Sequence, residues 1–179
     1  MTLTNFWGIH FKEMKIRYKK SGISITTTLS SIPEKNTDFT ITDSRDTTRK
    51  SILRVGFDGK NVTVQILWSH FSDDVDIGFH WSEESKVLFV GAGSVSAVLN
   101  LDTMDIIDIN YPVLFWQWKY INDHILELGE LECRLYSTSG KFIGQTAVDP
   151  PYEYEMIDNA IEFTSIVVGK TRIDLSKEL

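Results

Sequence analysis

The chain has 179 residues, of which 42% are hydrophobic and 24% charged, and its formal net charge is −7. This composition is typical of a globular domain and excludes an intrinsically disordered chain. No apolar run approaches the roughly 18 to 20 residues needed to cross a bilayer. The first fifteen residues are interrupted by His10, Lys12 and Glu13, which is unlike a secretory signal peptide. We therefore expect a cytoplasmic protein without membrane contact.

The charges are distributed unevenly along the chain. Residues 1–60 hold eleven basic and six acidic residues, a net charge of +5, whereas residues 61–179 hold seven basic and nineteen acidic residues, a net charge of −12. An acidic body repels a phosphate backbone, so we expect no nucleic-acid partner. A basic protein is the better candidate, although an acidic surface can also serve solubility alone.

Strand-like alternation of apolar and polar residues recurs from one end of the chain to the other. In chain order it covers residues 14–18, 23–29, 62–68, 75–81, 95–101, 114–120 and 152–156. Turn signals separate these runs at Ser21-Gly22, Asp58-Gly59, Gly91-Ala92-Gly93, Asn122-Asp123 and Ser139-Gly140. The pattern predicts an all-β, mostly antiparallel meander with little or no helix, arranged as a sandwich, a half-open barrel or a propeller-like stack of sheets.

We expect one domain over residues 1–179. It comprises an N-terminal ribbon at 1–29, a long loop at 30–50 and a main sheet body at 51–179. The loop is expected because residues 30–50 are rich in Ser, Thr, Asp, Asn and Lys, and Phe39–Ile41 could form at most a short strand.

The sequence carries no catalytic motif. Cys133 lies at strand spacing between Leu131 and Leu135, which predicts a buried, inert thiol, and a single cysteine excludes an internal disulfide. No serine lies in a G-x-S-x-G turn. Residues 91–94 join two strands, so they predict a hairpin turn and not a phosphate loop. We expect no enzyme activity, no catalytic residues and no cofactor.

Metal chemistry has one candidate region. Asp74, Asp76 and His80 would share the polar face of a strand, which places oxygen and nitrogen ligands on one side. Side chains two apart on a strand diverge, however, and the segment lacks the spaced ligands of a calcium loop. A solvated polar face is the favoured interpretation, so we expect no metal.

Two acidic segments are candidates for partner binding. The first comprises Asp73, Asp74, Asp76, Glu83 and Glu84. The second comprises Asp149, Tyr152, Glu153, Tyr154, Glu155 and Asp158. Tyrosines supply contact area at little entropic cost, and carboxylates steer and pair with Lys or Arg. The alternative for the second segment is an edge strand with its tyrosines in the core and its glutamates in water. Trp116 and Trp118 are expected in the core.

The chain resembles a known class of binding protein. The segments Lys86-Val-Leu-Phe-Val-Gly-Ala-Gly, Val98-Leu-Asn-Leu-Asp-Thr and Tyr136-Ser-Thr-Ser-Gly-Lys-Phe-Ile-Gly are similar in character to β meanders of immunity proteins from bacterial contact-dependent growth inhibition and related polymorphic toxin systems. The resemblance implies a tight 1:1 complex with a cognate basic toxin. It also implies that the acidic surface covers a cationic active site, as in an inhibitor of a nuclease.

Two other functions stay open. A carbohydrate-active or small-ligand-binding β protein would use carboxylates and a tryptophan in a concave face. A structural or assembly component would self-associate. The immunity hypothesis predicts that charge reversal at Glu153 and Glu155 slows association with the partner.

Overall fold

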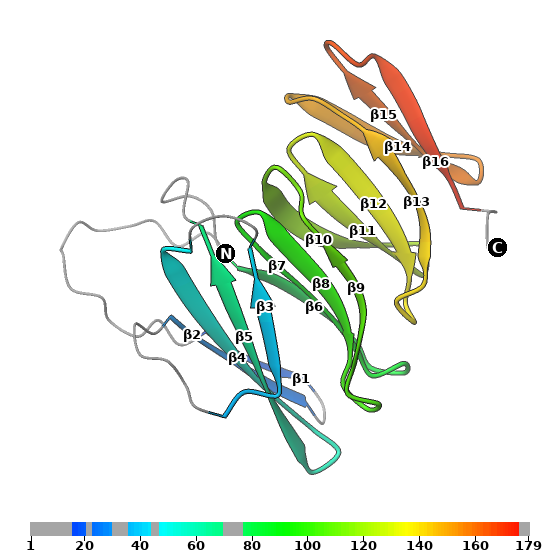
Figure 1. The fold of residues 1–179 in the computed structure, drawn as a ribbon. Helices are drawn as coiled ribbons and strands as arrows, with labels where there is room; N and C mark the ends of the chain where they lie inside the picture. The colour runs from blue at the N-terminus through cyan, green and yellow to red at the C-terminus, as the bar shows by residue number, and fades with distance from the viewer. Residues whose placement is uncertain (1–15, 21–22, 30–35, 44–46, 70–76, 176–179) are drawn as a thin grey trace.

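The computed structural model describes residues 16–20, 23–29, 36–43, 47–69 and 77–175. Within these residues the chain forms sixteen strands in four sheets (Figure 1), which confirms the all-β prediction. The pairing is antiparallel throughout except between β3 and β5, which run parallel. The described residues include no helix long and apolar enough to cross a membrane.

The sheets follow one another along the chain, and we call them A to D. Sheet A contains β1 (Ile16–Lys20), β2 (Ile23–Leu29), β3 (Phe39–Thr42), β4 (Arg49–Phe57) and β5 (Lys60–Trp68), in the order β1-β2-β4-β5-β3. Sheet B contains β6 (Gly78–Ser82), β7 (Val87–Ala92), β8 (Val95–Asn100) and β9 (Asp105–Asn110). Sheet C contains β10 (Phe115–Ile121), β11 (His124–Gly129), β12 (Glu132–Ser137) and β13 (Phe142–Ala147). Sheet D contains β14 (Tyr152–Ile157), β15 (Ala160–Ser165) and β16 (Lys170–Asp174).

The four sheets stack face to face in an open row, from the blue strands to the red ones in Figure 1. One hydrophobic core lies between sheets A and B, a second between B and C, and a third between C and D. Of the three arrangements expected from the sequence, the structure therefore shows the propeller-like stack.

Stacking on both sides explains the continuous apolar run in β7, where every residue is buried. Leu88 and Val90 belong to the core shared with sheet A, whereas Val87 and Phe89 belong to the core shared with sheet C. Alternate side chains of a strand point to opposite faces, so a strand covered on both faces has no polar side.

Sheet D is polar on the face that points away from sheet C. Glu153, Glu155, Thr164 and Lys170 lie on this outer face and are exposed, whereas Phe163 is buried against sheet C. A mostly polar outer face suits the terminal unit of a stack. Apolar exceptions in sheet D are Ile157 on this face and the exposed turn residues Ile166, Val167 and Val168.

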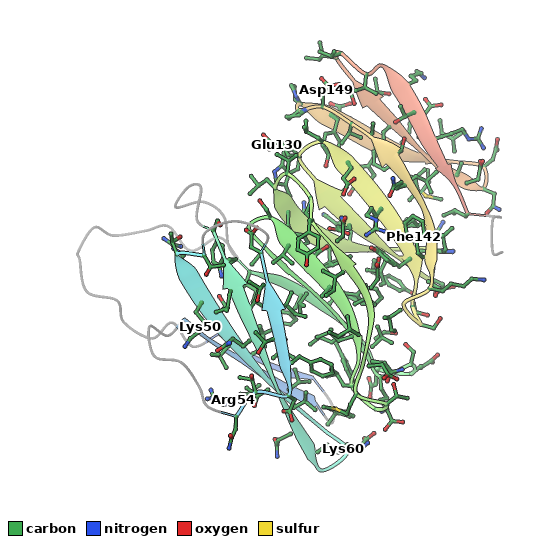
Figure 2. All side chains as sticks on the ribbon, viewed as in Figure 1. Lys50, Arg54, Lys60, Glu130, Phe142 and Asp149 are labelled. Carbon is green, nitrogen blue, oxygen red and sulfur yellow. The ribbon has the colours of Figure 1, made fainter. Side chains whose placement is uncertain are left out.

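The turns alternate between the two ends of the sheets. We call the end with the β4–β5, β6–β7, β10–β11 and β12–β13 turns the Asp123 end, and the opposite end the Asp149 end. Figure 2 shows Glu130 and Asp149 at the latter end and Lys60 at the former. The expected turns at Asp58-Gly59, Asn122-Asp123 and Ser139-Gly140 are confirmed, each with left-handed residues.

Residues 30–50 differ from the expected loop. Phe39–Thr42 forms β3, which pairs with β5, and β4 already begins at Arg49. Phe39 and Ile41 are buried in the core with sheet B. Burial of these two side chains stabilises the short strand although the residues around it are polar. The expected ribbon is not separate from the main body either, because β2 pairs with β4 in sheet A.

A β-bulge in β10 interrupts the alternation of side chains expected over residues 114–120. The register shifts between Phe115 and Gln117, so Phe115 and Trp118 are buried in the core between sheets B and C. Trp116 is 39% exposed and stacks on Tyr152 of sheet D. The prediction of a core position is confirmed for Trp118 and wrong for Trp116, because the extra residue of a bulge reverses the alternation.

Candidate functional site

A groove of about 1290 Å³ opens at the Asp123 end, between the β6–β7 and β10–β11 hairpins. Its lining residues are Phe79, His80, Trp81, Ser82, Glu83, Glu84, Lys86, Tyr120, Asp123 and Thr138. These residues come from strands of sheets B and C and from the turns that follow them. Aromatic rings and carboxylates together make this groove the leading candidate for a binding site.

An aromatic platform forms one part of the groove. The ring of Tyr120 stacks on that of His80, with centroids 6.0 Å apart and planes 14° from parallel. His80 in turn contacts the buried ring of Phe89 edge-on at 6.1 Å. A chain of three rings thus supports Tyr120 from the core, while Tyr120 itself remains 55% exposed.

The Tyr120 hydroxyl donates a hydrogen bond to the Asp123 carboxylate in the adjoining turn. This hydrogen bond, together with partial desolvation and the negative charges of Asp123 and Glu84, raises the pKa of the Tyr120 phenol. Asn122 and Asp123 both have positive φ, of 45° and 60°. Asn and Asp tolerate this left-handed conformation, which suits a two-residue hairpin turn. The turn therefore fixes the tyrosine ring in one orientation.

Carboxylates form the other part of the groove. Glu83 and Glu84 lie in the β6–β7 turn, are exposed, and form no ion pair with any residue in the described part of the chain. The nearby Lys86 ammonium is 2.9 Å from the Asp58 carboxylate, and the pKa of Lys86 is raised by this hydrogen bond and by the charges of Asp58, Glu83 and Asp102. The groove is therefore net negative.

The β6–β7 turn is tied to the rest of the Asp123 end. The Ser85 hydroxyl donates to the Thr138 carbonyl at 2.5 Å and lies 2.8 Å from the Ser82 hydroxyl. Thr138 belongs to the β12–β13 turn of sheet C. The turn that carries Glu83 and Glu84 is thus held across the boundary between sheets B and C.

The structure places the first predicted acidic segment only in part. Glu83 and Glu84 line the groove, whereas Asp73, Asp74 and Asp76 lie outside the described residues. The groove also contains His80, Tyr120 and Asp123, which sequence reasoning did not assign to partner binding. The Asn122-Asp123 turn was recognisable, but nothing in the sequence shows that it faces the β6–β7 turn.

The second predicted segment does not form a single patch. Tyr152 and Tyr154 point toward sheet C and pack on the ring of Phe163, whereas Glu153 and Glu155 are exposed on the outer face of sheet D. This is the arrangement that the edge-strand alternative described.

The two ends of that segment lie at opposite ends of the sheet. The Asp149 carboxylate accepts hydrogen bonds from the backbone amides of Val167 and Val168, which ties together two turns. Asp158 lies in the β14–β15 turn, with φ of 53°. Asp149 therefore has a structural role, while partner binding by this segment stays a prediction.

Cys133 is buried and has no disulfide, which confirms the expected buried thiol. Its Sγ lies 3.5 Å from the Tyr152 hydroxyl, which itself donates to the Gly129 carbonyl at 2.8 Å. Burial raises the pKa of the Cys133 thiol to about 11. A thiol of this kind is a poor nucleophile at neutral pH.

We predict that Cys133 reacts slowly with Ellman's reagent in the folded chain. The rise of its pKa from 9.0 to about 11 lowers the thiolate fraction about 100-fold at pH 8, and burial slows access further. The measurement compares the reaction rate in native buffer with that in guanidinium chloride. Rapid stoichiometric reaction in native buffer would contradict the buried environment.

A polar cluster is enclosed between sheets B and C, apart from the groove. Glu127, 1% exposed, accepts a 2.6 Å hydrogen bond from the Ser96 hydroxyl, and the Asn110 amide donates to Glu132 at 2.8 Å. Burial raises the pKa of Glu127 to about 7. The sheets exclude solvent from Glu127, so its ionisation is coupled to the stability of the fold.

An ion pair between sheets B and C lies beside Glu127, whose pKa it influences through Arg134. The Arg134 guanidinium lies 3.1 Å from the Asp108 carboxylate, which also accepts a hydrogen bond from the Tyr136 hydroxyl at 3.0 Å.

Within the described residues, no group of three or more His, Cys, Asp or Glu side chains could hold a metal ion.

Comparison of the sequence with protein-family models finds no match, and comparison with curated proteins finds none either. Among solved structures, the chain is similar to Kluyveromyces lactis Hsv2, with 8% identity and a TM-score of 0.31 over 59% of this chain. It is also similar to the β-propeller domain of the Trilobed protease from Pyrococcus furiosus, with 11% identity and a TM-score of 0.42 over 90% of this chain. The matches cover 35% of the Hsv2 chain and 53% of the protease chain. Likenesses at these scores transfer no function.

Proposed function

We propose that the chain is a binding protein whose acidic groove engages a basic protein partner. The observation that supports this most is the groove itself, where Glu83 and Glu84, which pair with no residue in the described part of the chain, lie beside the exposed ring of Tyr120. Exposed aromatics and carboxylates near a concave surface are what a basic partner's Lys and Arg side chains recognise. The charge of −12 over residues 61–179 would steer such a partner toward this body.

Within that class, we propose an immunity protein that neutralises a cognate toxin of a bacterial growth-inhibition system. The resemblance of the β meander to such proteins and the acidic surface support this assignment. A nuclease toxin needs a cationic active site to hold phosphates, and an acidic groove is complementary to it. The chain would act in the cytosol by occlusion, as one copy per toxin.

Co-expression tests the proposed function. The chain is produced together with a candidate toxin domain of the same bacterial system, and growth of the host cells is followed with and without the chain. We expect the chain to restore growth and to co-purify with the toxin as a 1:1 complex in size-exclusion chromatography with light scattering. Growth arrest despite full expression of a folded chain would contradict the proposal.

Charge reversal is predicted to identify the face that binds. Because Glu83 and Glu84 form no ion pair with any described residue, the double variant Glu83→Lys/Glu84→Lys should slow association with the toxin about tenfold at low salt and weaken its salt dependence. Stopped-flow fluorescence at two salt concentrations measures both effects.

The matched control is Glu153→Lys/Glu155→Lys, which makes the same charge change on the outer face of sheet D. The sequence alone predicts that this variant slows association; if the groove is the interface instead, association should be nearly unchanged. The opposite result would place the interface on sheet D and remove the groove from the proposed function.

The groove also favours one alternative, a protein that binds a carbohydrate or another small ligand. Trp81 and Tyr120 line it together with carboxylates, and sugars stack on aromatic rings while carboxylates accept their hydroxyl hydrogens. A sugar-dependent change in tryptophan emission, abolished by Tyr120→Leu, would support this alternative.

A further inference from the structure

Tyr120 offers an accessible aromatic ring that contacts with two other residues hold in place. His80 covers one face of the ring at 6.0 Å and Asp123 holds its hydroxyl, yet Tyr120 is still 55% exposed. Two contacts, with His80 and with Asp123, therefore hold a ring that lines the groove and keeps part of its surface accessible. A planar group that stacks there meets a ring that needs little further ordering.

The charges that line the groove are mostly negative. Lys86 is a cation of this lining, but its ion pair is with Asp58, and Glu83 and Glu84 form no ion pair with any described residue. Glu83, Glu84 and Tyr120 line the same groove, and the charge of Glu84 is among the causes that raise the pKa of the Tyr120 phenol. The carboxylates and the platform thus belong to one site.

We propose that the groove takes the guanidinium group of an arginine side chain, stacked on Tyr120 and paired with Glu83 and Glu84. A guanidinium is planar and weakly hydrated, so it stacks on an aromatic ring and donates to a carboxylate through two parallel N–H groups. A lysine ammonium has the charge without the plane, and a neutral sugar leaves the carboxylates uncompensated. The inference rests on the proposed function for the identity of the partner that carries the arginine.

Three capped peptides, Gly-Gly-Xaa-Gly-Gly with arginine, lysine or citrulline at Xaa, test the proposal. Citrulline has nearly the shape of arginine but no charge. In two-dimensional ¹H–¹⁵N NMR titrations we expect the arginine peptide to shift the amides of Glu84, Tyr120 and Asp123, and to bind several-fold more tightly than the lysine peptide. The citrulline peptide should cause no shift at these amides.

Variants locate the effect in the groove. Glu84→Gln and Tyr120→Leu should each weaken binding of the arginine peptide about fivefold or more, since each removes one part of a cation–π and ion-pair site. Tyr120→Phe should weaken it less, because it keeps the ring and loses only the bond to Asp123. Glu155→Gln, on the outer face of sheet D, is the matched control and should not change the affinity.

Two results would overturn the proposal. Equal binding of the citrulline and arginine peptides would show that charge is not recognised, and tighter binding of maltotetraose than of the arginine peptide would assign the groove to a neutral sugar. Glu84→Gln changes only an exposed turn residue, so the test does not depend on whether Tyr120→Leu folds.

The failure of this inference differs from failure of the proposed function. If the toxin complex forms but the arginine peptide does not bind the groove, only the arginine site is wrong. If the arginine peptide binds as expected but the chain neither binds nor neutralises the toxin, the immunity function is wrong and the arginine site stands.

Discussion

Replacing Glu127 with glutamine is expected to raise the free energy of unfolding by about 3 kcal/mol at pH 8 and to leave it nearly unchanged at pH 4.5. Burial between sheets B and C raises the pKa of this carboxyl from 4.5 to about 7, because an ionised carboxylate loses hydration there. Glutamine has the shape of the protonated acid and never ionises, so the variant avoids that loss.

The groups around Glu127 act in both directions. Ser96 and Asn110 of sheet B donate to it and, like the charge of Arg134, lower its pKa, whereas the charge of Glu132 raises it. Desolvation outweighs the favourable partners, and the Oε2 atom of Glu127 accepts no hydrogen bond from any residue that the structure describes. The net effect of ionisation is therefore destabilising.

The sign follows from proton binding. The folded chain holds the Glu127 proton more tightly than the unfolded chain does, so the contribution of this group to stability is lost as the pH rises from 4.5 to about 7. Urea unfolding of the parent chain and of Glu127→Gln at several pH values measures the difference. Glu155→Gln, an exposed carboxylate on sheet D, is the control and should change the free energy of unfolding by less than about 0.5 kcal/mol. A constant difference between parent and Glu127→Gln across this pH range would show that Glu127 does not titrate there.

The sequence allowed the strands and many turns to be predicted because their signals are local. Alternation in Tyr152–Met156 and the left-handed residues of Asn122-Asp123 each depend on a few neighbouring residues. The short strand Phe39–Thr42 depends instead on its parallel partner β5, which lies more than twenty residues away. From its local sequence alone, such a polar segment is therefore predicted to be a loop.

The groove could be predicted only in part for the same reason. Glu83 and Glu84 are conspicuous in the sequence, but the ring that completes their site comes from another sheet. The alternating run over residues 114–120 predicts that Trp116, Trp118 and Tyr120 share one face, but the bulge in β10 changes which of these side chains is buried. Which sheets stack on one another depends on the whole chain. The residues of a single strand do not show which strand of another sheet will lie beside it.

The core between sheets B and C contributes to the stability of the fold and also supports the residues of the groove. It contains fewer buried residues than the other two cores, and the polar cluster of Glu127 occupies part of the same interface. Phe89 lies at its centre with 0% exposure and contacts the rings of Trp118 and Tyr136. The same ring supports His80, on which Tyr120 stacks.

We predict that Phe89→Ala lowers the free energy of unfolding by about 3 to 5 kcal/mol, as expected when a fully buried phenylalanine leaves a cavity. Because His80 then loses its support, binding of the arginine peptide should weaken as well. Phe163→Ala is the matched control: Phe163 is equally buried, but in the core between sheets C and D, away from the groove. It should cost similar stability and leave peptide affinity unchanged.

Urea unfolding and peptide titration of both variants, at a temperature where each is folded, separate two explanations of the groove. If the rings of Phe89 and His80 set the position of Tyr120, only Phe89→Ala weakens the arginine peptide. If the overall stability of the fold sets the position of Tyr120, both variants weaken binding of the arginine peptide equally. The idea that Phe89 and His80 support the Tyr120 ring is then wrong. The milder pair Phe89→Leu and Phe163→Leu applies the same comparison should either alanine variant fail to fold. A platform that rests on the core would explain how an exposed tyrosine keeps one orientation on a surface that otherwise consists of short hairpin turns.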